Sequence, residues 1–161
     1  MARIYSQAIV QRLMEFFEKE KWRYRFDSEE GVFYFGLNLE KRVNIQYALD
    51  VHGFSYITYG MSPFHGDPKD SEMMTQIARF LSMANYGLKY GNFEINMADG
   101  DIRYKCSVDC EDITLSDSVI KTSIHVPAIV FEQYSKGIVQ IIFNNMTAEE
   151  AIYLCEGDDG M

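Results

Sequence analysis

The sequence predicts an α+β fold, in which an antiparallel sheet carries helices packed on one face. Two observations support this fold class. Stretches in which apolar and polar residues alternate follow one another across short polar turns, which is typical of consecutive hairpins. Stretches with apolar residues at helical spacing precede, interrupt and follow these strands. We expect the order α-β-β-β-(β)-α-β-β-α-α, with the division of residues 43–60 into strands left open.

The first 60 residues predict one helix followed by hairpins. Apolar residues at helical spacing indicate the helix: Tyr5, Ile9, Leu13, Phe16 and Phe17. From residue 22 the period changes to two, and a first strand presents one apolar face: Trp22, Tyr24 and Phe26. A polar turn over residues 28–31 leads into a second strand over residues 32–39. Two further strands pair across His52-Gly53 with their apolar residues on one face: Ile45, Tyr47, Leu49 and Val51, then Phe54, Tyr56 and Thr58.

Capping residues mark the second helix. Asp67 is the predicted N-cap, and Pro68 occupies the first helical position. Asp70 lies in the first turn, where a negative charge is favourable. Gly87 is the predicted stop, because glycine adopts the left-handed conformation that often ends a helix. The apolar stripe between these ends comprises Met73, Ile77, Phe80, Leu81 and Ala84.

Residues 93–106 predict a hairpin whose register follows from its turn. Asp99-Gly100 is a preferred two-residue turn of type I′, which requires positive φ at both central positions. Counting outward from this turn places six apolar side chains on one face, as the pairs Met97 with Ile102, Ile95 with Tyr104 and Phe93 with Cys106. The intervening pairs are polar: Asn96 with Arg103 and Glu94 with Lys105.

A long third helix follows the hairpin. Thr114 and Asp117 resemble a capping pair at its start. Pro127 lies inside the helical pattern, and it should kink or interrupt the helix because it lacks an N–H and clashes with the preceding turn.

A short helix closes the chain. Thr147 and Glu150 form a capping box at its start, and it should end near Gly157. The chain contains no linker and no internal repeat. We therefore expect a single domain over residues 1–157, followed by a frayed acidic tail over residues 158–161.

The composition argues against two classes of partner. The net charge is −9, and fifteen Lys and Arg are scattered among twenty-four acids, so we expect no nucleic-acid partner. No apolar run approaches the length that crosses a bilayer, and polar residues interrupt the N-terminal apolar stretch, unlike a signal peptide. Three cysteines without a dense framework suit free thiols in a reducing compartment. The prediction is a cytoplasmic protein that does not enter a membrane.

No motif for catalysis or cofactor binding is present, including GxxxxGK, GxGxxG, HExxH, GxSxG and CxxC. His52, His65 and His125 are candidates for acid–base chemistry or metal binding. None has a partner at metal-ligand spacing, and we interpret all three as surface or hydrogen-bonded histidines.

Two clusters have both a chemical and a structural interpretation. Cys106 and Cys110 lie four residues apart, and we interpret them as buried thiols because Cys106 falls on the apolar hairpin face. His65, Asp67 and Asp70 could form an oxygen-rich metal site, but helix capping accounts for both aspartates. We predict no catalytic residue, no metal and no cofactor.

The strand over residues 31–39 is apolar on both faces. Phe33, Phe35 and Leu37 lie on one face, and Val32 and Tyr34 on the other. A sheet with one solvated face should instead alternate apolar and polar residues. Our hypothesis is that another chain covers the second face through Val32 and Tyr34; the alternative is that a loop or helix of the same chain covers it.

Several motifs together resemble the signature of the YbjN family, bacterial proteins described as sensory transduction regulators. They are Phe80-Leu81, residues 84–88 (ANYGL), residues 91–94 (GNFE), residues 99–104 (DGDIRY) and a later stretch, residues 145–151 (NMTAEEA). The family usually has proline where this chain has Ala148. The resemblance implies a fold like that of type III secretion chaperones, with helices on a curved antiparallel sheet, and often a dimer.

The resemblance implies a class of function. Chaperones of that kind bind other proteins and do no chemistry, so the leading hypothesis is a non-enzymatic protein-binding module. It would be a chaperone-like adaptor or regulator in bacterial signalling or stress response, with a protein partner and a possible homodimer. One alternative is a small-molecule sensor or carrier with an aromatic-lined pocket, and another is an unrecognised enzyme. We interpret the signature residues as structural, since their chemistry is that of caps and turns: Asn85, Tyr86, Gly87, Gly91, Asn92, Phe93, Glu94, Asp99, Gly100, Arg103 and Tyr104.

Overall fold

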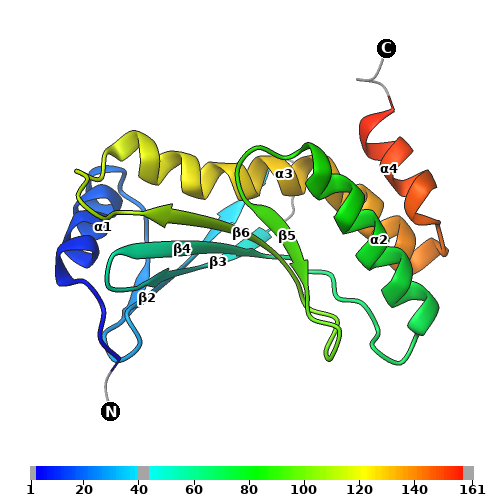
Figure 1. Ribbon diagram of the computed structural model, residues 1–161, viewed down its shortest axis with the longest axis horizontal. Helices are drawn as coiled ribbons and strands as arrows, with labels where there is room; N and C mark the ends of the chain where they lie inside the picture. The colour runs from blue at the N-terminus through cyan, green and yellow to red at the C-terminus, as the bar shows by residue number, and fades with distance from the viewer. Residues whose placement is uncertain (1–2, 40–43, 158–161) are drawn as a thin grey trace.

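The computed structural model describes residues 3–39 and 44–157. Within these two ranges the chain forms four helices and six strands (Figure 1). In chain order they are α1 (Gln7–Lys19), β1 (Arg25–Asp27), β2 (Val32–Asn38), β3 (Asn44–Val51), β4 (Ser55–Met61), α2 (Ser71–Gly87), β5 (Asn92–Ile95), β6 (Ile102–Asp109), α3 (Asp117–Asn144) and α4 (Ala148–Glu156). The predicted order is confirmed, and β3 and β4 are two separate strands.

All strand pairs are antiparallel, and the order across the sheet is β1-β2-β3-β4-β6-β5. β1 to β4 follow one another as hairpins, whereas α2 separates β4 from the β5–β6 hairpin. α1 and α3 lie over the same face of the sheet (Figure 1). Phe17 of α1 packs on Phe33 with 5.5 Å between ring centroids, and Tyr47 Oη donates to the Ile124 carbonyl of α3 at 2.7 Å. The predicted α+β class with helices on one face of an antiparallel sheet is confirmed.

The core lies between this face and the helices. Burial alternates along the strands, as in β3, whose buried residues are Ile45, Tyr47, Leu49 and Val51. The predicted stripe of α1 is confirmed for Ile9, Leu13, Phe16 and Phe17, whereas Tyr5 precedes the N-cap Ser6 and lies outside the helix. The first strand is shorter than predicted, because Trp22 leaves the sheet and packs on Phe16 of α1 at 5.8 Å between ring centroids.

The predicted register of the β5–β6 hairpin is wrong by two residues. Phe93 opposes Tyr104 rather than Cys106. The reason is a longer turn, in which the Gly100 N–H donates to the Asn96 carbonyl at 2.8 Å. Gly100 has φ +79°, but Asp99 is not among the residues with positive φ, so the turn is not of type I′.

The β3–β4 hairpin shows the same displacement. Val51 opposes Tyr56, and the His52 N–H donates to the Ser55 carbonyl at 2.8 Å. Phe54 therefore lies in the turn and is 70% exposed rather than on the apolar face. A shift of two residues preserves the face of each paired side chain, so the buried face of the strands was predicted correctly although the pairing was not. The exceptions are Phe54 and Met97, which lie in the two turns and are exposed.

α2 begins three residues later than predicted. Its N-cap is Asp70, whose carboxylate accepts from the Met73 N–H at 2.9 Å. Asp67 instead accepts from the Lys69 N–H at 2.9 Å in the preceding turn. At the other end Gly87 is the last helical residue and lacks positive φ, so it is not a left-handed stop.

α3 also departs from its predicted start. Its N-cap is Ser116, not Thr114, and the helix continues through Pro127 without interruption. Pro127 packs closely against β4 of the sheet. A Cβ added to Gly60 would lie only 3.0 Å from the Cβ of Pro127. Glycine at position 60 leaves room for this close approach.

The predicted capping box of α4 is confirmed. Thr147 Oγ1 accepts from the Glu150 N–H, and the Glu150 carboxylate accepts from the Thr147 N–H at 3.0 Å. Gly157 is the C-cap, as expected. The predicted tail over residues 158–161 lies outside the described residues.

Candidate functional site

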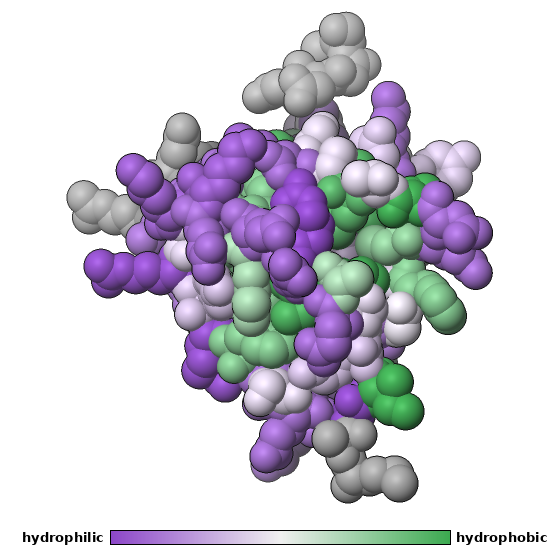
Figure 2. Space-filling view, turned by 90° about the vertical axis from the view of Figure 1, so that its left-hand side faces the viewer, coloured by the Kyte–Doolittle hydropathy of each residue, from purple (hydrophilic) through white to green (hydrophobic). Residues whose placement is uncertain are grey.

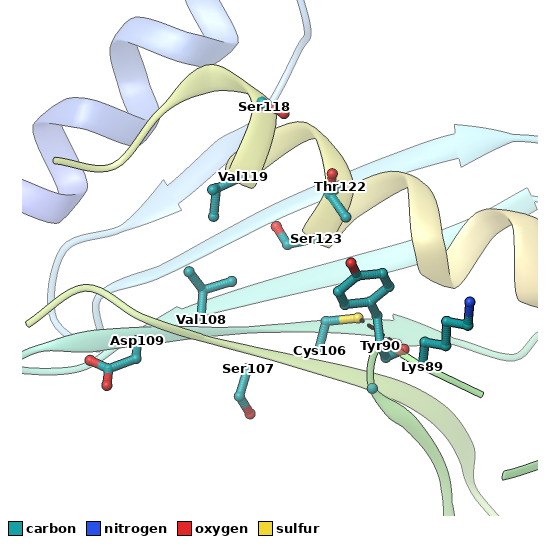
Figure 3. Close-up of a pocket in the computed structure, with 11 residues that line it drawn as sticks. Lys89, Tyr90, Cys106, Ser107, Val108, Asp109, Ser118, Val119, Thr122 and Ser123 are labelled. Carbon is teal, nitrogen blue, oxygen red and sulfur yellow. Dashed lines mark hydrogen bonds between the residues drawn. The ribbon is translucent and has the colours of Figure 1, made fainter. Parts of the chain in front are cut away.

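A groove of about 520 Å³ lies between β6 and the N-terminal half of α3 (Figure 3). Three separate segments form it: the loop after α2, the second half of β6 and the first two turns of α3. The lining residues are Lys89, Tyr90, Gly91, Cys106, Ser107, Val108, Asp109, Ser118, Val119, Thr122 and Ser123. Most of these side chains are small.

β6 is paired along both edges over only half of its length. β4 pairs with it from Arg103 to Asp109, but β5 pairs only with Ile102–Lys105. No described strand pairs with the other edge of Cys106–Asp109, which we call the free edge of β6. The groove lies along this free edge (Figure 3).

The backbone groups of Ser107 and Asp109 point to the free edge. Backbone groups of alternate residues in an antiparallel strand face opposite neighbours. On the β4 side, the Ser62 N–H donates to the Ile102 carbonyl at 2.9 Å, and the Cys110 N–H donates to the Phe54 carbonyl at 2.8 Å. Even-numbered residues therefore face β4, and the odd-numbered Ser107 and Asp109 present N–H and C=O groups to the groove.

The chain closes the neighbouring edge with a side chain. On the outer edge of β5, the Phe93 N–H donates to Asn85 Oδ1 at 2.7 Å, and Asn85 Nδ2 donates to the Phe93 carbonyl at 3.1 Å. No described side chain makes an equivalent pair of bonds to Ser107. Since unpaired strand edges invite further pairing, the free edge of β6 is the place where this sheet accepts another strand.

The floor of the groove is polar but saturated with hydrogen bonds. Ser123 is 4% exposed, and its Oγ lies 3.0 Å from Tyr56 Oη while donating to the Ile120 carbonyl at 2.8 Å. Cys106 is also buried, and burial raises its thiol pKa to about 11, so sulfur stays protonated at neutral pH. Among the described lining residues there is no histidine to serve as a base. The arrangement suits binding and lacks an activated nucleophile.

The two ends of the groove carry opposite charges. Lys89 and Asp109 lie at its opposite ends (Figure 3). Glu111 and Asp112 are exposed and follow Asp109 in the chain. Among the described residues, none of these four groups takes part in an ion pair within 4.0 Å. Their charges are therefore available to a bound partner.

A second candidate surface is the face of the sheet opposite the helices. Tyr34 lies on it and is 36% exposed, with the Arg25 guanidinium 4.3 Å from its ring centroid. Arg103 stacks in the same way on Tyr59 at 4.2 Å. Val32, which we predicted to contact a partner together with Tyr34, is only 8% exposed, so the chain itself covers it.

Surface hydropathy is mixed at the end of the molecule where α1 lies. Figure 2 shows hydrophobic side chains near the middle of this side, interrupted and surrounded by hydrophilic ones. Exposed apolar residues also occur on the helices, among them Phe143 (65%) and Tyr153 (76%). Most of them stand alone in the sequence, which is normal for a protein surface, whereas Tyr153 and Leu154 are neighbours on α4.

The signature residues near the hairpin make mostly structural contacts. Gly91 has φ +74°, and a Cβ there would lie 2.2 Å from the Lys105 carbonyl. Burial tends to raise the pKa of Glu94, but hydrogen bonds from Arg103 and Lys105 outweigh it and lower that pKa. Tyr104 is buried and its hydroxyl donates to the Tyr90 carbonyl.

Two further signature residues bind backbone groups close to them in the sequence. Asn92 Nδ2 donates to the Phe93 carbonyl at 3.2 Å, and Asp99 accepts from the Asp101 N–H at 2.9 Å. Asn85 binds the N–H and the carbonyl of Phe93 in β5. Tyr86 is 97% exposed, and nothing in the structure explains its place in the signature.

The three histidines lie apart. His52 is 3.3 Å from Asp50 and His65 is 3.4 Å from Asp101, measured between ring nitrogen and carboxylate oxygen. His125 packs beside Trp22 with 5.9 Å between ring centroids, and its buried Nε2 has no hydrogen-bond partner among the described residues, contrary to our interpretation. Within residues 3–39 and 44–157, no group of three or more His, Cys, Asp or Glu side chains could hold a metal ion. Of the helices in those ranges, none is long and apolar enough to cross a membrane.

Our sequence analysis did not identify the groove. Its residues on α3 carry no motif, and the hairpin was expected to pair further along β6. One signal was available: Gly91 interrupts the strand pattern only one residue before β5 begins, so β5 could not extend beside residues 106–109.

Comparisons with known proteins include a similarity to a solved structure. No family model matches the chain, and no curated protein matches it. Among solved structures, it is similar to a chain in the structure of the HopA1-SchA chaperone-effector complex, with a TM-score of 0.45 and 15% sequence identity. The similarity covers 75% of this chain and 87% of that one.

Proposed function

We propose that this chain is a non-enzymatic protein-binding module, a chaperone-like adaptor or regulator that works in bacterial signalling or stress response in the cytoplasm. The free edge of β6 is the observation that carries the proposal. It offers the backbone groups of Ser107 and Asp109 inside a groove, beside a wall formed by α3. The resemblance to the YbjN family supports the same class of function.

Binding would occur by strand addition, in which an extended segment of a partner protein pairs with the free edge. The edge spans four residues, Cys106 to Asp109, which corresponds to a strand of about 14 Å. Main-chain hydrogen bonds would supply affinity, and Val108, Val119 and Thr122 would contact alternate side chains of the segment. The acidic chain, with its net charge of −9, favours partners with basic character.

Replacement of Ser107 tests this proposal, because Ser107→Pro removes an N–H that faces the groove and not β4. Ser107→Ala is the matched control, since it keeps the N–H and removes only the hydroxyl. A random peptide library selected on the wild-type protein should yield peptides that bind wild type and Ser107→Ala alike. The same peptides should bind Ser107→Pro at least about fivefold more weakly, because a pairing hydrogen bond is lost.

Two results would contradict the proposal. One is a selection that yields no peptide above background. The other is a set of peptides that bind Ser107→Pro as well as wild type, because their site would then not involve the free edge. Circular dichroism and thermal unfolding of both variants establish that the sheet is intact before binding is compared.

The volume of the groove favours a second candidate function, a small-molecule sensor or carrier. About 520 Å³ falls within the usual range for small ligands, and Tyr90 is an aromatic lining residue. Native mass spectrometry of the freshly purified protein would show a ligand of constant mass. If that ligand were displaced by bulky Val119→Trp but not by Ser107→Pro, the carrier function would replace the proposal above.

A further inference from the structure

We infer that the partner segment binds antiparallel to β6, with a basic residue near its amino end and an acidic residue near its carboxyl end. This inference rests on the proposed function and names the chemistry of the partner. Three properties of the groove lead to it: the direction of β6, the charges at the two ends, and the alternation of side chains along the free edge.

The direction of the added strand follows from its neighbours. Every strand pair in the sheet is antiparallel, and antiparallel pairing is slightly more stable per residue than parallel pairing. β5 already occupies the same edge of β6, starting at Asn92 opposite Lys105. A segment that continues the line of β5 has its amino end beside Asp109 and its carboxyl end beside Gly91.

The charges at these two ends differ in sign. Asp109 lies at the amino end of the added segment, with Glu111 and Asp112 following it in the chain. Lys89 lies at the carboxyl end, two residues before Gly91 (Figure 3). A basic residue opposite Asp109 and an acidic residue beside Lys89 therefore complement the groove in the antiparallel direction. A parallel segment would need the opposite order of charges.

Side-chain alternation specifies the middle of the segment. Residues directly opposite one another in an antiparallel pair project from the same face. Positions opposite Val108 and Cys106 project toward α3, where Val119 and Thr122 leave room for small apolar side chains. The position opposite Ser107 projects to the exposed side of the sheet and suits a polar residue. The four paired positions, from opposite Asp109 to opposite Cys106, are basic, apolar, polar and apolar. The acidic residue follows beyond the paired stretch, beside Lys89, because Asn92 already lies opposite Lys105.

Two blocked pentapeptides of identical composition test the inference: KVTVE, which fits the antiparallel pattern, and EVTVK, which fits the parallel one. Binding is measured from NMR shifts of the Ser107 and Asp109 amide signals as each peptide is titrated to millimolar concentration. We expect KVTVE to bind at least about threefold more tightly, the size expected from two exposed ion pairs. The preference should weaken in 1 M NaCl, because salt screens exposed charges.

A charge-exchange variant provides the decisive comparison. Lys89→Glu combined with Asp109→Lys should make EVTVK the tighter ligand. The matched control exchanges two exposed charges outside the groove, Glu29→Lys with Lys69→Glu, keeps the net charge, and should leave the preference for KVTVE unchanged.

The possible failures of the inference and of the proposed function are distinguishable. Equal binding of both peptides, or tighter binding of EVTVK to the wild-type protein, overturns the inference. If the binding of these peptides is lost in Ser107→Pro, the proposed function stands without the inference. If neither peptide moves the Ser107 and Asp109 signals, both are contradicted.

Discussion

The side-chain amide of Asn85 binds both backbone groups of Phe93. Asn85 Oδ1 accepts from the Phe93 N–H at 2.7 Å, and Nδ2 donates to the Phe93 carbonyl at 3.1 Å. One residue of α2 thus occupies the outer edge of β5 as a neighbouring strand would. The same hairpin leaves the free edge of β6 without such a partner, so the sheet is closed at one place and open at the adjacent one.

Asn85→Ala should reduce the free energy of unfolding by about 1–3 kcal/mol, because two backbone groups at the edge of the core lose their partners. Urea denaturation measures this change. Tyr86→Ala is a suitable control on the next residue of α2, since its side chain is 97% exposed, and it should stay within about 0.5 kcal/mol of wild type. Equal stabilities for the two variants would show that Asn85 does not hold β5.

Two glycines on either side of the loop after α2 should respond oppositely to alanine. At Gly91 the φ of +74° and a Cβ only 2.2 Å from the Lys105 carbonyl predict a loss of at least about 2 kcal/mol. At Gly87 an added Cβ meets nothing within 4 Å, and alanine should stabilise the end of α2 by up to about 1 kcal/mol. Thermal unfolding of Gly91→Ala and Gly87→Ala measures the two changes in stability. A Gly91→Ala protein as stable as wild type would contradict the described conformation of the loop.

The ion cluster between α1 and α3 should make stability depend on acid pH. A hydrogen bond from Lys19, and next one from Arg12, lower the pKa of Asp117 to about 2 from its ordinary value of 3.8. Because the folded-state pKa is depressed, the stabilisation is complete above the unfolded value and is lost as pH falls through about 2.

Asp117→Asn tests this dependence. The difference in urea midpoint between wild type and variant should be present at pH 7 and should disappear between about pH 4 and pH 2. It should also shrink in 1 M NaCl at pH 7, because exposed ion pairs are screened by salt. A difference that is constant across this pH range would show that Asp117 does not act through its charge.

Cys106 should react slowly with thiol reagents in the native protein. With a pKa of about 11, less than roughly one thiol in a thousand is ionised at pH 7.5, and only the thiolate attacks. Timed iodoacetamide labelling with peptide mapping measures the rate, with the urea-unfolded protein as the reference. Native labelling as fast as unfolded labelling would indicate an activated thiol and would revive an enzymatic function for the groove.

Tyr34 should contribute to any self-association through the open sheet face. Tyr34→Glu places a charge on this face, and burying that charge in an interface would oppose assembly. Sedimentation velocity at rising concentration should show a smaller assembled fraction for Tyr34→Glu than for wild type. Tyr153→Glu on α4 is the control, because that side chain is 76% exposed on a helix away from the sheet. An unchanged profile for Tyr34→Glu would remove this face as an interface.

Both predicted hairpins show which property of a strand the sequence specifies. Each pairing was displaced by two residues, yet Phe93 and Tyr56 lie on the predicted apolar face. Period-two alternation determines the face, whereas the turn determines the register. In the β5–β6 hairpin the turn is also held from outside, because the Gly66 N–H donates to the Gly100 carbonyl at 2.9 Å. A contact between residues 34 positions apart has no local signal.

Local patterns in the sequence were enough to determine the order of elements, their buried faces and the capping box of α4, because these depend on residues close together in the chain. The free edge of β6 and its groove were decided only by the tertiary structure. They exist because β6 pairs with β4 across an intervening helix, while β5 covers only Ile102–Lys105. Packing between distant segments decides which backbone groups remain unpaired, and that is where this chain has room for a partner.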